Sequence, residues 1–246
     1  MTRRRTVIGC AAVLFAFGPT AGTGAETCQS DAILVFDGSG SMSETGFNQL
    51  DEPRIHMARR AIARAMPDIA AHRKVGLLTY GPGPGDACQN IDLRFPPISN
   101  AAPRVIAEIE ALEPSGDTAL TKSVQSAAEA LNYQSEPATV VLLTDGKETC
   151  GGAPCELGAT LAADGRDVTV HVIGFKVRGD FFNWAGQGKE DYLNGRTVAR
   201  CLADLTGGLY VSTETVGELA EALKQTLGCQ FLTLGPAIQN LQLHRG

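Results

Sequence analysis

Short apolar runs alternate with longer amphipathic stretches along most of this chain. The apolar runs predict strands, which are Ala32–Phe36, Val75–Tyr80, Ile91–Phe95, Thr139–Thr144, Val168–Gly174 and Leu209–Ser212. The stretches between them carry apolar residues at helical spacing and predict helices, which are Arg54–Ala70, Ala102–Leu112, Ala119–Leu131, Cys155–Ala163, Val198–Leu205 and Val216–Leu227. Strands that alternate with helices indicate an α/β domain whose mostly parallel sheet is covered on both faces.

One predicted strand, Ile91–Phe95, is expected to break the parallel order. The link that joins it to Val75–Tyr80 is rich in glycine and proline and is too short to hold a crossover helix. We therefore predict an antiparallel strand at an edge of the sheet. The segment Lys176–Gly195 has no clear pattern, and its aromatic residues suit either an inward-packing helical insertion or a loop that contacts a partner.

The amino-terminal residues have the pattern of a secretory signal peptide. Three arginines precede the apolar stretch Val7–Phe17, which is short for a membrane span, and small residues follow it. We expect residues 1–25 to be the signal peptide, with cleavage after Ala25, and the mature protein to be periplasmic or secreted. We expect one domain over residues 26–230 and a short C-terminal tail over 231–246. No later apolar stretch is long enough to span a bilayer.

The mature chain is acidic and keeps six cysteines. Removal of residues 1–25 takes away three arginines and no acids, so the formal net charge changes from -6 to -9. That charge argues against nucleic acid and against an anionic membrane surface as partners. An even number of cysteines in an exported chain predicts disulfides. A zinc site at Cys150 and Cys155 is the alternative, but no second close pair of Cys or His completes four ligands.

The segment Asp37–Ser41 reads Asp-Gly-Ser-Gly-Ser and directly follows a predicted strand. It brings one carboxylate and two hydroxyls into one loop at the carboxyl edge of the sheet, and small hard cations such as Mg²⁺ prefer oxygen ligands. A calcium EF-hand loop does not fit, because its sixth and twelfth positions are Met42 and Asn48. A nucleophile elbow does not fit, since Asp37 stands where that motif has glycine. A plain Gly/Ser turn is the simpler alternative.

Two further segments carry oxygen ligands at the same expected edge of the sheet. Thr118 stands just before a predicted helix, where a hydroxyl can either cap the helix or face a ligand. Asp145 follows the strand Thr139–Thr144 and precedes glycine, which in most proteins is only a turn. Neither segment is specific when taken alone.

Taken together, the three segments resemble the metal-ion-dependent adhesion site of the von Willebrand factor A (VWA) domain family. The resemblance covers about Cys28 to Cys229, and Thr144–Cys155 and Cys201–Gly208 are similar to segments of exported bacterial members. It implies a doubly wound, Rossmann-like sheet of six mostly parallel strands with one antiparallel edge strand. It also implies a metal site made of five residues, which are Asp37, Ser39, Ser41, Thr118 and Asp145.

The resemblance also implies how this site works. Ser39 and Ser41 would bind Mg²⁺ directly, Thr118 would bind it in the ligand-ready state, and the two aspartates would often act through water. Such a weakly charged ligand set keeps the metal electrophilic, and Mn²⁺ and Ca²⁺ are alternative ions. In relatives, the open sixth position takes a Glu or Asp of a protein partner. The chain is therefore expected to be a binding protein whose partner offers an acidic residue.

The resemblance further implies one disulfide. In this fold Cys28 precedes the first strand and Cys229 follows the last helix, both on the side away from the metal, so we predict that they pair. Two pairings remain open for the other four cysteines, which are Cys150–Cys155 with Cys88–Cys201, or Cys88–Cys150 with Cys155–Cys201.

Two other functions are compatible with a metal loop. A metal-dependent hydrolase or phosphatase could use Mg²⁺ and nearby hydroxyls. However, no His or free Cys lies on the motif loops as base or nucleophile, and Lys147 and Glu148 have the pattern of solvated charges at a loop tip. We therefore predict that the protein is not an enzyme. A structural module of an envelope complex is the third possibility, although the complete five-residue set argues against a decayed site.

Overall fold

The computed structural model describes residues 28, 30–45, 52–176 and 199–229. The strands are β1 (Asp31–Asp37), β2 (Val75–Tyr80), β3 (Ile91–Ile98), β4 (Ala138–Thr144), β5 (Val168–Phe175) and β6 (Tyr210–Thr213). The helices are α1 (Arg54–Ala70), α2 (Ala102–Glu110), α3 (Leu120–Ala130), α4 (Pro154–Asp164) and α6 (Val216–Leu227). Residues 199–205 are also helical. Every predicted strand and helix in the described ranges is therefore present, with ends shifted by a few residues.

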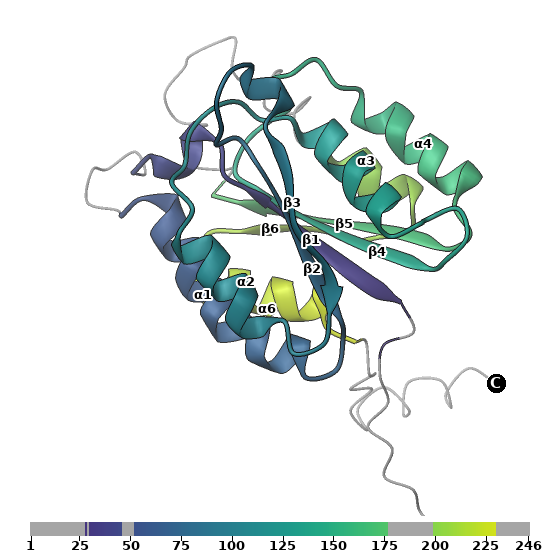
Figure 1. Cartoon of the computed structure of the whole chain (residues 1–246), viewed down its shortest axis with the longest axis horizontal. Helices are drawn as coiled ribbons and strands as arrows, with labels where there is room; N and C mark the ends of the chain where they lie inside the picture. The colour runs from purple at the N-terminus through teal and green to yellow at the C-terminus, as the bar shows by residue number, and fades with distance from the viewer. Residues whose placement is uncertain (1–27, 29, 46–51, 177–198, 230–246) are drawn as a thin grey trace, which may run out of the picture.

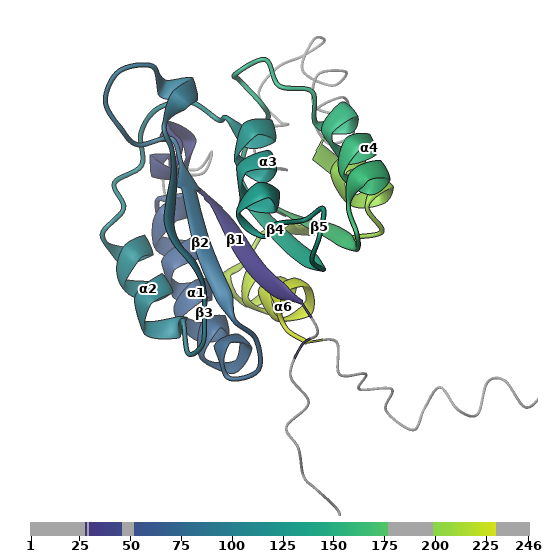
Figure 2. The same ribbon diagram turned by 45° about the vertical axis from the view of Figure 1, so that its right-hand side comes forward.

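The six strands form one sheet in the order β3-β2-β1-β4-β5-β6. Strand β1 lies between β2 and β4 and runs parallel to both, and β5 and β6 continue the parallel order beyond β4. Helices α1, α2 and α6 cover one face, and α3 and α4 cover the other (Figure 1, Figure 2). The chain therefore reverses its direction of travel across the sheet between β1 and β4, and ligand sites of open α/β sheets form outside the carboxyl ends of strands at such a point.

Strand β3 is antiparallel to β2 at the edge of the sheet, as its short link predicts. It extends three residues beyond the predicted end and includes Pro96 and Pro97. Proline has no N–H to donate to a neighbouring strand, so it is tolerated where one side of a strand is unpaired. The edge position explains why two prolines do not end this strand.

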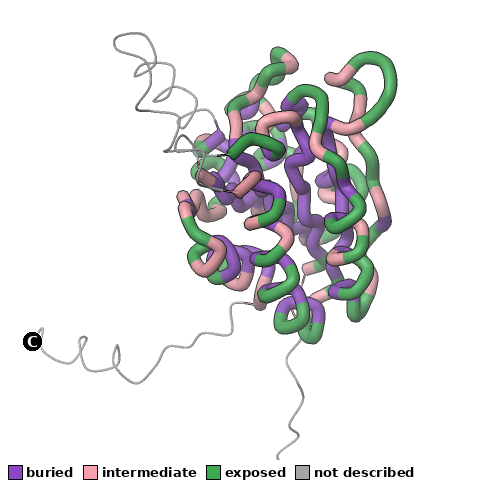
Figure 3. The backbone as a smooth tube through the Cα atoms, turned by 90° about the vertical axis from the view of Figure 1, so that its left-hand side faces the viewer, coloured by how far each residue is buried: buried purple, intermediate pink, exposed green. Residues whose placement is uncertain are grey.

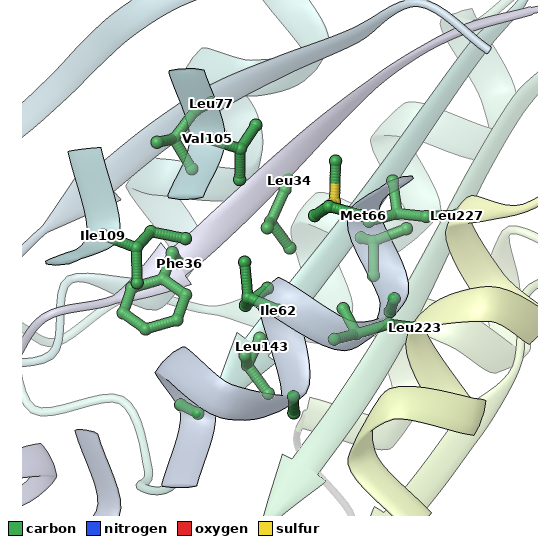
Figure 4. Packing of buried hydrophobic residues seen from close by; sticks show 14 of the residues in the cluster. Leu34, Phe36, Ile62, Met66, Leu77, Val105, Ile109, Leu143, Leu223 and Leu227 are labelled. Atoms are coloured by element: carbon green, nitrogen blue, oxygen red, sulfur yellow. The ribbon is translucent and has the colours of Figure 1, made fainter. Parts of the chain in front are cut away.

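Two apolar clusters hold the helices on the sheet. Alternate residues of β1 point to opposite faces, so Leu34 and Phe36 join the cluster under α1, α2 and α6, whereas Ile33 and Val35 join the cluster under α3 and α4. Figure 4 shows Leu34 and Phe36 grouped with α1 side chains in the first cluster. Strands β1, β2, β4 and β5 are buried along almost their whole length, whereas the edge strands β3 and β6 are more exposed. Most other exposed positions lie on the outer helix faces and loops (Figure 3). Burial on both faces fits the nearly uninterrupted apolar runs.

All six cysteines of the described residues are in disulfides. Cys28 pairs with Cys229, as predicted, with Cα atoms 5.1 Å apart. The remaining pairs are Cys88–Cys150 and Cys155–Cys201, which is one of the two pairings that the sequence left open. Thiols in disulfides are not available as zinc ligands, so the alternative zinc site at Cys150 and Cys155 is not formed.

Several predicted features lie outside the described residues. These are the signal peptide over residues 1–25, the tail over 231–246 and nearly all of the segment Lys176–Gly195. Among the helices that the structure does describe, none is long and apolar enough to cross a membrane.

A buried histidine on β5 should make stability depend on pH. Burial, and then the charge of Arg73, lowers the pKa of His171 to about 4, and its Nδ1 accepts a hydrogen bond from the Leu209 N–H. Between pH 6.5 and 4 the unfolded chain binds a proton that the folded chain does not, so the free energy of unfolding should fall by about 3 kcal/mol as the pH drops through that range.

Urea unfolding at about pH 7.5 and pH 4.5 measures this loss. The variant His171→Gln has no ring to protonate, so it should lose about 2.5 kcal/mol less than wild type between the two pH values. His72→Gln changes an exposed histidine and serves as the matched control. An equal loss in wild type and His171→Gln would contradict the assignment.

Candidate functional site

Three loops meet at the carboxyl edge of the sheet, next to the point where strand order reverses. Asp37 is the last residue of β1, and Asp145 directly follows β4, its parallel neighbour. Thr118 precedes α3, whose N-cap position is Ala119, so the structure does not use Thr118 as the cap that the sequence allowed. All five predicted site residues lie in this region, and three of them, Asp37, Ser39 and Asp145, are at most 2% exposed.

Backbone hydrogen bonds hold the first loop against the two neighbouring loops. The Gly38 N–H donates to Tyr80 O (2.9 Å) and the Gly40 N–H donates to Gly116 O (3.0 Å). The approach is close enough to require glycine at the contacts. A Cβ on Gly81, where φ is +106°, would lie 2.7 Å from the backbone of the first loop. The serines of the first loop are therefore fixed by the turn that follows β2 as well as by β1.

Hydroxyl and carboxylate oxygens converge above these loops. Ser39 Oγ lies 3.1 Å from Ser41 Oγ, and Ser41 Oγ donates to Asp145 Oδ1 at 2.7 Å. The hydroxyls of Ser41 and Thr118 would each lie 3.8 Å from a Cβ built on Gly146, so both face the same glycine. The structure thus brings the hydroxyls of Ser41 and Thr118 close to Gly146, which directly follows Asp145.

Asp37 is held at both carboxylate oxygens. The Ser39 N–H donates to Oδ1 (2.8 Å), and Thr144 Oγ1 donates to Oδ2 (2.6 Å). Tyr80, from the adjacent strand, donates its hydroxyl to Thr144 Oγ1 at 3.3 Å. Burial, and then the charge of Asp37, raises the pKa of Tyr80 well above its usual value, so this phenol stays protonated as a donor.

The Asp145 carboxyl group lies in a poorly hydrated place. Burial, and then the nearby charge of Asp37, raises the pKa of Asp145 to about 7. Hydrogen bonds from Ser41 and from Arg54 oppose that rise. Two carboxylates that are buried close together favour the binding of a cation, because a cation relieves their mutual repulsion.

The loop after Asp145 is tied to the start of α3. The Thr118 N–H donates to Thr149 Oγ1 (2.8 Å), and the Thr149 N–H donates back to Thr118 O (3.1 Å). Glu148 accepts from the Thr121 N–H and the Cys150 N–H, at 2.7 and 2.8 Å. This corrects our sequence interpretation of Glu148, because its carboxylate satisfies the amino end of a helix and is not a solvated charge.

The donor set fits a small, hard cation. In an octahedral shell with bonds of about 2.1 Å, adjacent oxygens lie about 3.0 Å apart, which is close to the Ser39–Ser41 separation of 3.1 Å. Within the described ranges, no group of three or more His, Cys, Asp or Glu could hold a metal ion. The candidate site is of a different kind, because it combines three hydroxyls with two carboxylates.

Sequence reasoning missed the residues that support this site. Thr144 and Tyr80 were assigned only to strands, and Arg54 only to the start of a helix. For Arg54 the sequence held a signal. A cation in the first turn of a helix is electrostatically unfavourable, so an arginine there suggests a nearby anion. For Thr144 and Tyr80, the pairing of separate strands had to be known first.

The chain is similar in sequence to known proteins. Residues 32–148 match the family model of the von Willebrand factor type A domain. The uncharacterized protein YwmD of Bacillus subtilis (strain 168) is 25% identical over 203 residues, which cover 78% of this chain and 83% of YwmD.

Solved structures share the fold at low sequence identity. Proximal thread matrix protein 1 from the mussel byssus, with a zinc-occupied MIDAS motif, is 20% identical with a TM-score of 0.54, over 82% of this chain and 48% of that one. The pilus adhesin SpaC from Lactobacillus rhamnosus GG is 15% identical with a TM-score of 0.60, over 82% of this chain and 30% of that one. This chain thus covers about half of the mussel protein (48%) and less than a third of the pilus adhesin (30%). Residues 32–148 thus match the von Willebrand factor type A family model, and the six-stranded, mostly parallel sheet is the fold that this chain shares with these solved structures.

Proposed function

We propose that this protein is an exported binding protein that recognises a protein partner through a metal-dependent adhesion site. The observation that carries the proposal is the cluster of hydroxyls from Ser39 and Ser41 with the Asp145 carboxylate, with Thr118 facing the same glycine as Ser41. The likeness to a mussel matrix protein with a zinc-occupied MIDAS motif and to a pilus adhesin supports it. Three disulfides support export, because such bonds persist in oxidising compartments.

Each site residue has a distinct part in this proposal. Ser39, Ser41 and Thr118 would supply neutral oxygen ligands to Mg²⁺, with Mn²⁺ or Ca²⁺ as alternatives. Asp37 and Asp145 would supply the negative charge that attracts the ion. The bound ion would act as a Lewis acid toward an oxygen ligand from outside the protein. An Asp or Glu on the partner is the ligand of suitable charge, and this recognition changes no covalent bond.

Loss of the first loop's ligands should remove metal binding without unfolding the protein. Calorimetric titration of wild type with Mg²⁺ should give one site per chain, and Asp37→Ala and Ser39→Ala should each show no measurable heat of binding. Ser135→Ala, an exposed serine outside the site, is the matched control and should bind as wild type does. Unchanged binding in both site variants would refute the assignment.

Capture of the partner tests the rest of the proposal. Immobilised wild type and Asp37→Ala are incubated with an extract of periplasm and cell envelope in Mg²⁺ or in EDTA. A protein retained only by wild type with Mg²⁺, and released by EDTA, is the expected partner. Retention that is equal in all four conditions would contradict metal-dependent recognition. Turnover of ester or phosphate substrates that is lost in Asp37→Ala would instead favour the hydrolase.

A further inference from the structure

Arg54 is a buried arginine that faces the candidate metal site from the first position of α1. Its side chain is 3% exposed. Its Nη1 donates to Asp145 Oδ2 (3.1 Å), to Ser41 O (3.0 Å) and to Glu44 Oε2 (3.2 Å). The Asp145 side chain is fully buried, whereas that of Glu44 is 63% exposed. The important contact of Arg54 is therefore with the candidate metal loops.

The Arg54 guanidinium lies at a position where the electrostatics of a helix disfavour a cation. The amino end of a helix carries partial positive charge, so a cation there is disfavoured. Burial disfavours it further unless an anion pairs with it. The Asp145 carboxylate is that anion, and removal of one partner of a buried ion pair leaves the other uncompensated. Arg54 and Asp145 therefore depend on each other.

We propose that Arg54 is the charge-balancing and positioning residue of this metal site, and that it limits how strongly the site attracts a metal ion. The inference rests on the proposed function. With Arg54, the buried groups Asp37 and Asp145 leave a formal charge of -1 and not -2. A divalent ion then leaves the site positive, which suits an outside carboxylate. Without Arg54 the same ion would leave it neutral.

Arg54→Lys separates the charge of this residue from the shape of its guanidinium. One terminal nitrogen, Nη1, lies within 3.2 Å of two carboxylates and a carbonyl. An ammonium group has three donors and could serve the same acceptors. Arg54→Lys keeps the positive charge, so it should stay closer to wild type in its response to Mg²⁺ than Arg54→Met, which removes the charge.

Thermal unfolding of the full chain in EDTA and in Mg²⁺, with calorimetric titration of Mg²⁺, tests this inference. In EDTA, Arg54→Met should unfold at a lower temperature than wild type, because two buried carboxylates lack their counter-cation. Mg²⁺ should restore much of the loss, so its stabilising shift should be larger than in wild type. Its Kd for Mg²⁺ should be about tenfold lower, since one positive charge is gone. The Mg²⁺-induced shift and the Kd of Arg54→Lys should be closer to those of wild type than to those of Arg54→Met.

The controls separate this inference from the proposed function. Arg64→Met removes an exposed arginine from the same helix and should leave the Mg²⁺-induced shift unchanged. If Arg54→Met does not fold, Arg54→Gln removes the same charge and keeps an N–H donor. Equal Mg²⁺ shifts and Kd values in wild type and the neutral variants would overturn the role of Arg54. A wild type without any shift, or a shift retained in Asp37→Ala, would overturn the metal site itself.

Discussion

Replacement of Cys28 and Cys229 by serine should lower the free energy of unfolding by about 5 kcal/mol, because their bond closes a loop of 201 residues. A longer closed loop removes more conformational freedom from the unfolded chain, so this bridge should stabilise the domain most of the three. It joins Cys28, which precedes β1, to Cys229, which follows α6, at the end of the parallel strands opposite to the candidate site. Urea unfolding of the double variant at low temperature measures the loss.

The same variant should leave the candidate site intact. Its Mg²⁺ affinity, measured by calorimetry below its unfolding transition, should equal that of wild type. A loss of stability much below 3 kcal/mol would mean that the unfolded chain is already compact or that the bond imposes a penalty on the fold. A change in Mg²⁺ affinity would contradict the separation of this bridge from the site.

Removal of the Cys88–Cys150 bridge should weaken metal binding as well as stability. The chain-entropy model gives about 4 kcal/mol of stability for its loop of 62 residues. Cys150 also directly follows Thr149, which is hydrogen-bonded to Thr118. A loosened loop must be ordered again when the metal binds, and ordering even one residue costs about 1–2 kcal/mol. The double variant Cys88→Ser/Cys150→Ser should therefore bind Mg²⁺ about tenfold more weakly.

The third bridge is the matched control. Cys155–Cys201 closes a loop of 46 residues, so its removal should also cost about 4 kcal/mol. It joins α4 to the helical segment 199–205 and does not hold Thr118. Cys155→Ser/Cys201→Ser should thus lose stability and keep its Mg²⁺ affinity. Equal weakening of Mg²⁺ binding in both double variants would show that general destabilisation, and not the tie to Thr118, is responsible.

Prediction of the fold from sequence succeeded where burial shapes the pattern of residues. Strands covered on both faces must be apolar throughout, so β1, β2 and β4 stand out from the helices between them. The predicted end of β3 was too early, since the strand continues through Pro96 and Pro97 to Ile98. Whether proline breaks a strand depends on whether both sides are paired, and that is a tertiary property.

Prediction of the candidate site reached the residues that the structure brings to one end of the sheet, but not the residues that support them. Asp37, Ser39 and Ser41 are close in sequence, and Thr118 and Asp145 follow in the family's order, so a linear motif could find them. Thr144, Tyr80 and Arg54 act through hydrogen bonds to these residues from neighbouring strands and from α1. Threonine and tyrosine are common at such positions, and no spacing marks them as part of a site. For Arg54 the signal was a cation in the first turn of a helix, which suggests a nearby anion but does not say which one.

The disulfides, too, could be predicted from the sequence only in part. The even count predicts disulfides from the chemistry of thiols in an oxidising compartment, and the resemblance paired the two at the ends of the domain. The other four cysteines had two pairings that the sequence could not separate. The structure selects Cys88–Cys150 and Cys155–Cys201, with Cα separations of 5.5 and 5.2 Å, since a disulfide forms only where two chain segments already lie that close.

Local periodicity and local spacing were enough to predict most strand and helix residues and the oxygen-bearing residues that follow the strands. The pairing of Arg54 with Asp145, the bond from Thr144 to Asp37 and the bond from the amino end of α3 to Glu148 depend on how the layers pack. These contacts join residues that are 27 to 107 positions apart. Burial turns such contacts into strong interactions, and burial is settled only when the layers pack.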